Sequence, residues 1–427
     1  MHHFAYKEGE LYCEDVPVSK IAREMGTPLY IYSHATLLRH FRAFDGAFGD
    51  VPHITCFAVK SNSNIAVLKL FAGEGGGADI VSGGELYRAL SAGIDPGKIV
   101  YSGVGKTAEE MAYALRSEIL MFNVESSQEI ALLNDVAGKM GKRASIAIRV
   151  NPDVDPETHP YISTGLKEHK FGIDIEKALE DYRVASGLSH LHVAGVSCHI
   201  GSQLTRVSPF VDALRKLNEF VGKLRKKGIP IEYLDLGGGL GITYDKEAPP
   251  HPGEYAAALK KELDMEGLTV VLEPGRVIAG NAGILVAKVL YVKRSPQKNF
   301  VVIDAAMNDL IRPSLYGSYH DIQPVRRSEQ GVLKADVVGP ICESTDFMAR
   351  DRDMAAFEPG DLMAVMSAGA YGFSMASNYN SRPRVPEVMV RKDRYFVIRE
   401  RETYEDLVRG ERIPDFPGGH KSVTSNQ

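Results

Sequence analysis

The sequence predicts an α/β fold in which a (β/α)₈ barrel is joined to a second, mostly antiparallel β domain. Eight apolar runs of strand length occur before residue 274, and amphipathic stretches of helical period separate most of them. After about residue 283, strand-like runs follow one another with few helices between them. Continuous apolar strands that alternate with helices indicate a parallel sheet that is covered on both faces.

The eight barrel strands are expected at residues 54–59, 78–81, 99–102, 120–124, 145–150, 193–199, 233–236 and 269–273. Residues 84–90 and 210–217 are two of the amphipathic stretches between them. Eight such units in about 250 residues are what a closed barrel requires. An open doubly wound sheet is the alternative, but no G-x-G-x-x-G motif follows the first run.

The second domain is expected from the C-terminal part of the chain together with its first residues. Its strands are predicted at 287–292, 300–303, 362–366, 388–390 and 395–398, with a hairpin connection at 392–394 and a strand-like segment at 28–32. The barrel is therefore predicted over 34–282, and the β domain over 1–33 plus 283–410. The tail 411–427 is rich in Pro, Gly and polar residues and is expected to be poorly ordered.

Composition excludes several classes of function. The 427 residues are 44% hydrophobic and 25% charged, which suits two globular domains, and the net charge of -5 argues against a nucleic-acid partner. No apolar run approaches the roughly 18 residues of a membrane helix, and the first residues lack the apolar core of a signal peptide. Four cysteines lie far apart without a C-x-x-C pair, so neither a zinc site nor a disulfide framework is suggested. We expect a reduced, soluble, cytoplasmic protein without a metal site and without a membrane partner.

Reactive residue types end several of the predicted barrel strands, and the active site of such a barrel lies at these carboxyl ends. Lys60 follows the first run, His199 ends the sixth and Glu273 ends the eighth. Desolvation at the rim of a buried strand is expected to lower the pKa of Lys60 toward the range where its amine is nucleophilic. Such a lysine can form a Schiff base with a carbonyl substrate or with pyridoxal phosphate. A strand-end lysine is by itself most often a solvated surface residue, so the interpretation depends on its neighbours.

Two glycine-rich turns are expected at the same rim. Residues 237–241 follow the seventh strand, and Gly275 and Arg276 follow the eighth. The first turn exposes backbone N–H groups to an anion, and barrels often bind phosphate in the loops after strands seven and eight. A lone glycine run is more often only a tight turn, but this position in the barrel favours a phosphate site.

Glu273 and His199 each have two interpretations. Glu273 can hold a pyridine nitrogen protonated, which makes the ring a good electron sink, or it can form an ion pair with Arg276 or Arg149. His199 can be a hydrogen-bonded core histidine, which is the commoner role, or it can lie against a flat cofactor ring. Spacing does not decide either case.

The second domain contributes two further groups of candidate residues. Cys342 and Glu343 lie in a polar loop after a strand-like run, and a thiol in such a place can donate a proton. Arg312, Tyr316 and Tyr371 lie in turn contexts, and arginine suits bidentate binding of a carboxylate.

Together these motifs resemble the fold-type III pyridoxal-phosphate decarboxylases, from about residue 6 to about residue 379. The resemblance implies an alanine racemase-like architecture, in which an N-terminal (β/α)₈ barrel precedes a β domain that also includes the first residues. It further implies pyridoxal 5′-phosphate as the cofactor. A head-to-tail homodimer with active sites at its interface is the implied assembly.

The resemblance also implies a role for each candidate residue. Lys60 is similar to the Schiff-base lysine, and His199 to the residue stacked on the cofactor ring. Cys342 resembles the proton donor and Glu343 the partner of the substrate's distal ammonium, both reaching into the neighbouring subunit's site. The other implied ligands are Ser202, Gly239, Gly275 and Arg276 for the phosphate, Glu273 for the pyridinium nitrogen, Arg276, Arg312 and Tyr316 for the substrate carboxylate, and Tyr371 for both cofactor and substrate.

Three segments are similar to the members of this family that act on diaminopimelate: residues 312–320, Glu343 after Cys342, and the long loop over 151–172. The implied reaction is decarboxylation of meso-2,6-diaminopimelate to L-lysine and CO₂, the last step of lysine biosynthesis. An ornithine- or arginine-type decarboxylase on the same fold remains the nearest alternative. A catalytically inactive regulatory relative, or an aldolase-like barrel that uses Lys60 without a cofactor, is more distant.

Overall fold

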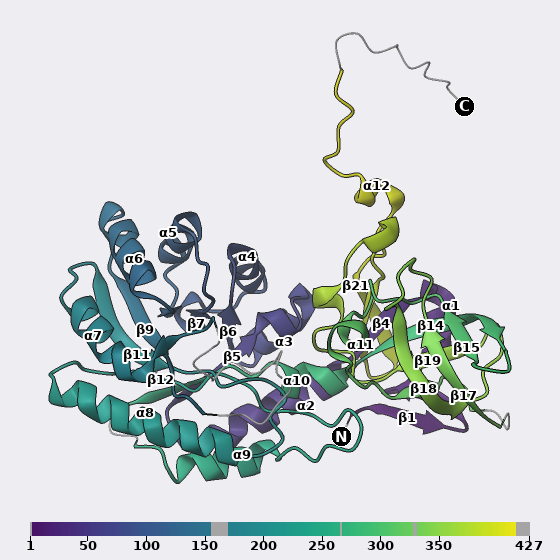
Figure 1. Ribbon diagram of the computed structural model, residues 1–427, viewed down its shortest axis with the longest axis horizontal. Coiled ribbons are helices and arrows are strands. Elements are labelled where there is room, and N and C mark those ends of the chain that lie inside the picture. Colours follow the sequence, from purple (N-terminus) through teal and green to yellow (C-terminus); the bar gives the residue numbers. More distant parts are fainter. Residues whose placement is uncertain (1, 155–169, 265–266, 328–330, 416–427) are drawn as a thin grey trace.

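The computed structural model describes residues 2–154, 170–264, 267–327 and 331–415. Two lobes lie side by side, with the barrel in one and the second sheet in the other (Figure 1). None of the described helices is long and apolar enough to cross a membrane.

The first lobe contains a closed barrel of eight parallel strands, as predicted. β8 pairs with both β7 and β9, and β13 pairs with β5, so the sheet closes on itself. A short additional strand, β10 (Ile173–Asp174), pairs with β9. The barrel strands are β5 (His53–Ala58), β6 (Gly77–Ile80), β7 (Ile99–Tyr101), β8 (Met121–Val124), β9 (Ala144–Asn151), β11 (Leu191–Ser197), β12 (Tyr233–Asp235) and β13 (Thr269–Leu272).

Helices cover the outside of the barrel, and most of them begin after a residue whose side chain caps the first turn. Ser33 accepts a hydrogen bond from the N–H of Thr36, and Thr107 forms a capping box with Glu110. These side chains satisfy N–H groups that have no partner within the helix. The helices are α2 (His34–Asp45), α3 (Ile65–Gly73), α4 (Gly83–Ser91), α5 (Ala108–Ser117), α6 (Ser127–Lys139), α7 (Ile175–Ser186), α8 (Ser208–Lys226), α9 (Pro252–Lys260) and α10 (Arg276–Ala279).

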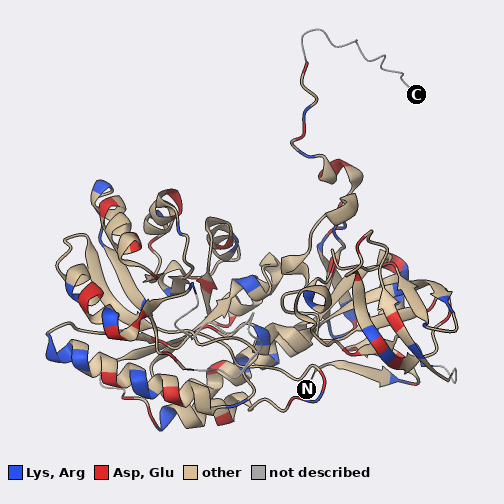
Figure 2. Cartoon of the chain, in the orientation of Figure 1, with Lys and Arg blue, Asp and Glu red and all other residues tan. Residues whose placement is uncertain are grey.

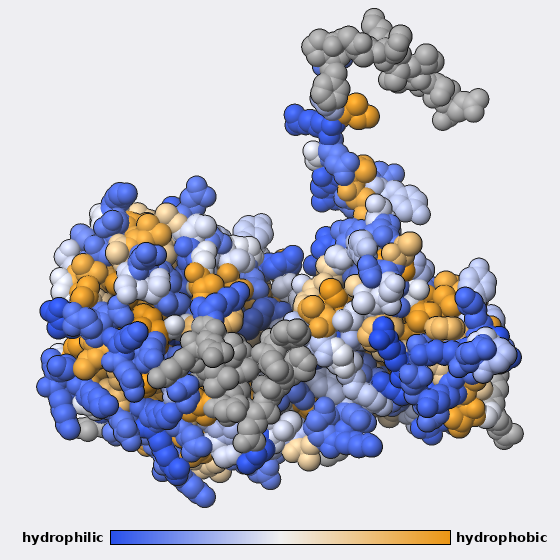
Figure 3. Space-filling model, in the orientation of Figure 1, coloured by the Kyte–Doolittle hydropathy of each residue, from blue (hydrophilic) through white to orange (hydrophobic). Residues whose placement is uncertain are grey.

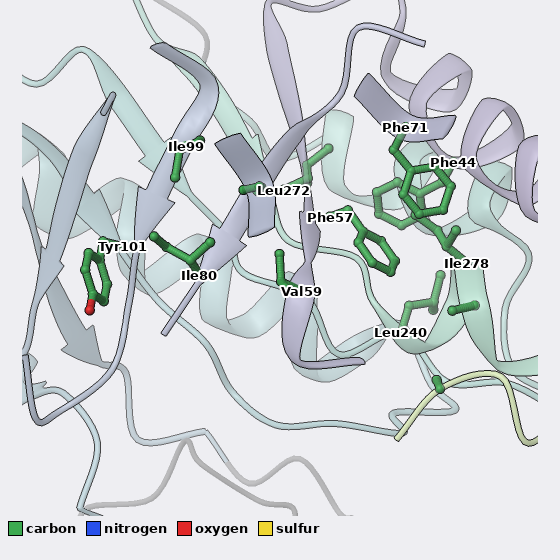
Figure 4. Packing of buried hydrophobic residues seen from close by; sticks show 14 of the residues in the cluster. Phe44, Phe57, Val59, Phe71, Ile80, Ile99, Tyr101, Leu240, Leu272 and Ile278 are labelled. Atoms are coloured by element: carbon green, nitrogen blue, oxygen red, sulfur yellow. The ribbon is translucent and has the colours of Figure 1, made fainter. Parts of the chain in front are cut away.

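Aromatic side chains fill the space between β5 and its neighbouring helices (Figure 4). The rings of Phe57 and Phe71 are 4.5 Å apart, and Phe57 and Val59 are fully buried. Burying a side chain of this size contributes about 1.5–3 kcal/mol. The apolar residues that precede Lys60 therefore fix the position from which it enters the site.

The second lobe contains a mostly antiparallel sheet, as predicted, in the order β18-β17-β15-β14-β4-β20-β21; β19 also pairs with β14, and β16 pairs with β19. Only the pairs β15–β17 and β4–β20 are parallel among its described strand pairs. The strands are β4 (Leu29–Ser33), β14 (Gly283–Lys293), β15 (Phe300–Ile303), β16 (Ile322–Pro324), β17 (Val332–Val338), β18 (Phe347–Ala355), β19 (Leu362–Val365), β20 (Glu387–Arg391) and β21 (Arg394–Arg399).

The N-terminal segment joins this lobe, as the strand-like pattern at 28–32 predicts. β4 lies between β14 and β20, and β1 (Phe4–Lys7), β2 (Glu10–Cys13) and β3 (Val16–Pro17) form a separate antiparallel sheet followed by α1 (Val18–Met25). β17 is the strand-like run that was expected before Cys342, whereas β16 and β18 were not predicted. β18 carries exposed charged residues over much of its length, and these interrupt the apolar pattern.

The face of the molecule that Figure 3 shows is mainly hydrophilic. Acidic and basic residues are interspersed along the outer helices, for example on α8 (Figure 2). The chain leaves the second lobe through α12 (Tyr404–Leu407). Residues 411–415 are exposed and form no helix or strand, and the rest of the predicted tail, 416–427, lies outside the described residues.

Candidate active site

A cavity of about 360 Å³ opens at the carboxyl ends of the barrel strands and is closed on one side by the second lobe. Ten of the twelve predicted site residues line it. They are Lys60, His199, Ser202, Gly239, Glu273, Gly275, Arg276, Arg312, Tyr316 and Tyr371. The structure therefore brings together side chains that are spread over more than three hundred residues of sequence.

Lys60 enters this cavity from a short 3₁₀ turn (Val59–Ser61) that directly follows β5. Its Nζ lies 2.5 Å from Oδ2 of Asp79, a fully buried carboxylate on β6. Burial by itself would lower the pKa of Lys60, but the charge and hydrogen bond of Asp79, with the nearby acid Glu273, raise it. The prediction of a lowered pKa was wrong, because it included desolvation without the carboxylates that face the amine.

Glu273 lies at the floor of the cavity among polar groups from other strands. Its Oε1 is 3.3 Å from the amide nitrogen of Asn123 and 3.4 Å from Oγ of Ser102. Burial raises the pKa of Glu273 well above its usual value, and the charge of Asp235 raises it further. The alternative ion pair with Arg149 does not form, because that guanidinium lies 3.2 Å from Oε1 of Glu125.

The turn over 237–241 adopts backbone conformations that suit glycine. Gly237 and Gly239 have φ angles of 65° and 114°. A Cβ atom at Gly238 would lie 2.1 Å from the carbonyl oxygen of Glu273, and one at Gly239 would lie 2.4 Å from the carbonyl oxygen of Gly201. The turn therefore packs backbone against backbone beside Ser202, where only glycine fits.

His199 follows β11, and its ring borders the cavity. Nδ1 accepts a hydrogen bond from the N–H of Gly238 at 3.2 Å. Burial lowers the pKa of His199 well below its usual value, and the charges of Arg149 and Lys60 lower it further. The ring is thus a neutral, flat surface at the cavity wall, in a position that serves a stacking role.

Two arginines contact Tyr244, a tyrosine that was not among the predicted site residues. The hydroxyl of Tyr244 accepts a hydrogen bond from Nη1 of Arg276 at 2.7 Å, and the guanidinium of Arg312 lies 4.6 Å from the centre of the Tyr244 ring. Nη2 of Arg276 donates to Oγ of Ser202 at 2.9 Å. Both arginines are more than 90% buried, so the cavity carries strong positive charge beside the lysine.

His320 holds Arg312 through a hydrogen bond and was also not among the predicted site residues. Its Nδ1 lies 2.8 Å from the carbonyl oxygen of Met366, and its Nε2 lies 2.9 Å from Nη1 of Arg312. Nδ1 must therefore carry the proton and Nε2 must accept from Arg312. Burial and the charge of Arg312 lower the pKa of His320 to about 3, so the ring is neutral and does not cancel the charge of the arginine.

Tyr371 connects the second lobe to the 3₁₀ turn that carries Lys60. Its backbone N–H donates to the carbonyl oxygen of Ser61 at 2.7 Å, and its ring lies 4.7 Å from the guanidinium of Arg276. Tyr316 ends α11 (Arg312–Tyr316), which places it on the same wall as Arg312. Both tyrosines therefore lie where they were predicted.

Cys342 and Glu343 do not line this cavity in the described part of the chain. Both are exposed in the loop between β17 and β18. The N–H of Cys342 donates to Oδ1 of Asn380 at 2.8 Å, and Asp346 holds the loop by accepting the N–H of Ile341 at 2.8 Å. A single chain thus presents this thiol and carboxylate on its surface.

Three of the missed residues share a weak sequence signal. Asp79, Asn123 and Asp235 are polar residues inside apolar strand runs, and a polar group at such a position must face a specific partner. Tyr244 lies in a segment without regular periodicity, and His320 ends the singled-out segment 312–320, where no pattern marks it among its neighbours.

Comparison with known proteins agrees with this geometry. Residues 34–280 match the protein family described as "Pyridoxal-dependent decarboxylase, pyridoxal binding domain". Diaminopimelate decarboxylase of Vibrio cholerae is 53% identical over 409 residues, which cover 95% of this chain and 98% of that protein. The chain belongs to the diaminopimelate decarboxylase family.

Solved structures of this family have the same fold. The crystal structure of AQ1208 from Aquifex aeolicus matches with a TM-score of 0.90 at 48% identity, over 95% of this chain and 97% of that one. Diaminopimelate decarboxylase from Helicobacter pylori complexed with L-lysine matches with a TM-score of 0.89 at 43% identity, over 92% of this chain and 98% of that one. The barrel and the antiparallel β domain are thus the architecture of the diaminopimelate decarboxylase family.

Proposed function

We propose that this protein decarboxylates meso-2,6-diaminopimelate to L-lysine and CO₂, with pyridoxal 5′-phosphate as its cofactor. The observation that carries the proposal is one cavity in which Lys60, the buried acid Glu273 and the guanidinium groups of Arg276 and Arg312 meet. An amine for an aldehyde, an acid for a ring nitrogen and cations for carboxylates are the groups that this cofactor and this substrate need. The names of the relatives support the same substrate.

The donor set of the cavity fits the cofactor. Lys60 would hold its aldehyde carbon, Glu273 would face its ring nitrogen, and His199 would lie against its ring. Ser202, Gly239, Gly275 and Arg276 would hold the phosphate, and Nε of Arg276 is a buried donor without a hydrogen-bond partner in the described part of the chain. When bound, pyridoxal phosphate withdraws electrons from the bond to the departing carboxyl group.

The chain itself manages the protons of this reaction. Lys60 must lose a proton before its amine can act as a nucleophile, and Oδ2 of Asp79 at 2.5 Å is placed to accept it. A proton must later return to the carbon that has lost CO₂. Lys60 and Cys342 are the two candidate donors.

The positive charge of the arginines selects the substrate. Diaminopimelate keeps a second carboxylate far from the reacting centre, and Arg312 with Tyr316 would bind it. A substrate without this group leaves a buried guanidinium unpaired, which is a strong basis for rejection. Ornithine and arginine lack a second carboxylate and are therefore expected to be poor substrates.

The exposed positions of Cys342 and Glu343 support a homodimer with shared sites as part of the proposal. In such a dimer the loop that carries them would enter the neighbouring subunit's cavity and would exclude water from it. Residues 34–282 would form the cofactor-binding domain, and 1–33 with 283–410 would complete the substrate site and the interface. We place the enzyme in the cytoplasm, where its four free cysteines remain reduced.

The test is product formation by purified, cofactor-loaded protein from meso-diaminopimelate, with ornithine and arginine as parallel substrates. We expect L-lysine and CO₂ from diaminopimelate, and little product from the other two. Lys60→Ala should abolish turnover, whereas Lys288→Ala, which alters an exposed lysine on β14, should not.

Each of the other outcomes would indicate a different function for this protein. Turnover of ornithine or arginine instead of diaminopimelate would overturn the substrate and leave the role of Lys60 standing. No turnover of any of the three, with cofactor bound, would favour a regulatory relative.

A further inference from the structure

Three carboxyl groups meet in the interior of the barrel below Lys60. Asp79 lies on β6, Asp235 ends β12, and Glu273 directly follows β13. Asp79 and Asp235 are fully buried, and Glu273 is 7% exposed. These strands lie within one run of four neighbouring strands, β12-β13-β5-β6, so their carboxyl groups come close together inside the barrel.

One amide side chain connects two of these acids. Nδ2 of Asn123 lies 2.7 Å from Oδ2 of Asp235 and 3.3 Å from Oε1 of Glu273. The other oxygen of Asp235 accepts the N–H of Gly237 at 2.9 Å. Asp235 thus contacts both the acid that would face the cofactor ring and the turn that would hold the cofactor phosphate.

The cluster has more negative charge than the described cations can neutralise. Lys60 is paired with Asp79 at 2.5 Å, which leaves Asp235 and Glu273 side by side. Two carboxylates that share a buried site do not both ionise. The other titratable groups near the cluster are already paired or neutral: Arg149 on Glu125, Lys106 on Glu129, the neutral ring of His199, and the thiols of Cys56 and Cys198, whose pKa values burial raises.

Hydrogen bonding gives independent evidence for a missing proton donor. Oδ1 of Asp79 and Oδ1 of Asn123 are buried acceptors without a partner among the described residues. Buried polar atoms are rarely left in this state. A carboxyl O–H within the cluster supplies a donor where acceptors are in excess.

We propose that Asp235 and Glu273 share one proton before the cofactor binds, and that this proton passes to the cofactor's ring nitrogen on binding. In this step the O–H bond of the carboxyl group breaks and an N–H bond forms on the ring, so no proton is taken from solvent. Asp235 is then a positioning residue: its negative charge keeps the proton on Glu273 until a pyridine nitrogen arrives. The inference rests on the proposed use of pyridoxal phosphate.

Burial and the repulsion between the two acids both favour a retained proton, as the proposed transfer requires. Burial, then the charge of Asp235, raises the pKa of Glu273 well above its usual value, and burial raises the pKa of Asp235 to about 6. Near pH 8 the pair therefore holds one proton, and Glu273 holds it more strongly. Once the ring nitrogen carries the proton, its positive charge allows both acids to ionise.

The test measures protons taken up when pyridoxine 5′-phosphate binds to cofactor-free protein. This analogue has the ring nitrogen and the phosphate but lacks the aldehyde, so Lys60 does not react with it. Titration calorimetry at pH 8 in two buffers of different ionisation enthalpy gives the number of protons exchanged. Asp235→Asn keeps an oxygen for the N–H of Gly237 but removes the neighbouring charge, so the pKa of Glu273 should fall and a smaller fraction of Glu273 should hold a proton before binding.

On binding the analogue, Asp235→Asn should take up more protons than the unmodified protein does. The expected difference is at most about one proton per site. Asp309→Asn is the matched control, because it removes a buried acid of the second lobe whose pKa burial also raises, and it should behave like the unmodified protein. Equal proton uptake by the unmodified protein and Asp235→Asn would overturn the proposal.

An infrared difference spectrum of the unmodified protein gives a second readout that does not depend on the folding of Asp235→Asn. Binding of the analogue, which has no carbonyl group, should remove a carboxylic-acid band, and this change should be absent in Glu273→Gln. Failure to see the band disappear while the analogue binds would overturn proton sharing and leave the proposed function intact. If the analogue does not bind at all, the proposed cofactor itself is wrong.

Discussion

Replacement of Arg312 by alanine tests how the cavity selects its substrate. The guanidinium is 5% exposed, lies 4.6 Å from the centre of the Tyr244 ring and receives support from His320 at 2.9 Å. Its contacts within the chain are thus to neutral groups, and its charge remains available for a carboxylate. Arg276 would remain to hold the phosphate end of the cofactor.

The magnitude follows from the burial of this charge. Truncating one member of a buried, hydrogen-bonded charge pair costs about 2–5 kcal/mol. At 1.4 kcal/mol for each factor of ten, kcat/KM for diaminopimelate should fall by roughly 30- to 4000-fold. The Kd of pyridoxal phosphate should change by less than about threefold, because within the described residues Arg312 contacts Tyr244, Ser318 and His320, and none of these lies in the cofactor-binding turns.

The assay combines CO₂ release at varied diaminopimelate with a cofactor titration followed by absorbance. Arg294→Ala, which removes an exposed arginine paired with Glu358, serves as the control and should match the unmodified protein in both measurements. Equal losses in turnover and in cofactor affinity would refute the reasoning, because they would mean that Arg312 supports the whole site and not the substrate alone.

Three further perturbations follow from buried contacts. The pKa of His320 is lowered from 6.5 to about 3, so between these pH values the unfolded chain binds a proton that the folded chain does not. The free energy of unfolding should therefore fall as the pH drops from 6.5 toward 3. His320→Gln should flatten this pH dependence in urea titrations. In Gly239→Ala the new Cβ would meet the carbonyl oxygen of Gly201 at 2.4 Å, and we expect at least a tenfold weaker Kd for pyridoxal phosphate, measured by absorbance. Glu387 is 1% exposed and accepts hydrogen bonds from the buried hydroxyl of Tyr32 and the buried amide of Asn64, each at 2.8 Å. Glu387→Ala leaves both donors without this partner and should lower the free energy of unfolding by about 2–6 kcal/mol in a urea titration. A loss below 1 kcal/mol would mean that these donors are not buried in solution.

The barrel could be predicted because each of its units is encoded locally. The apolar runs that became β5 to β9 and β11 to β13 alternate with amphipathic helices, and the closed sheet needs no further information. The edge strand β18 was missed, since the exposed charged residues along it hide the alternation. Prediction thus succeeded where an apolar run marks a strand, even at the exposed edge strand β21, and failed where charged residues interrupt the run.

The charge state of Lys60 shows the limit of the same reasoning. Its position at the end of β5 follows from the sequence, but its pKa is set mainly by two opposing effects, burial and the nearby carboxylates. Asp79 is only nineteen residues away, yet nothing in the spacing places its carboxylate 2.5 Å from the amine. The direction of the pKa shift of Lys60 therefore depends on how the strands are arranged around the barrel, and the sequence does not show this arrangement.

The sequence by itself determined which residue types stand at the ends of the strands, and hence that a lysine, a histidine, an acid and glycine turns share one rim. Strand ends meet because parallel strands in a closed barrel all point the same way. Only the tertiary structure decided that Tyr244 contacts two arginines, that His320 is neutral, that Asp235 adjoins Glu273, and that Cys342 faces outward. These properties depend on distances of a few ångströms between segments far apart in the chain, and no local pattern encodes such distances.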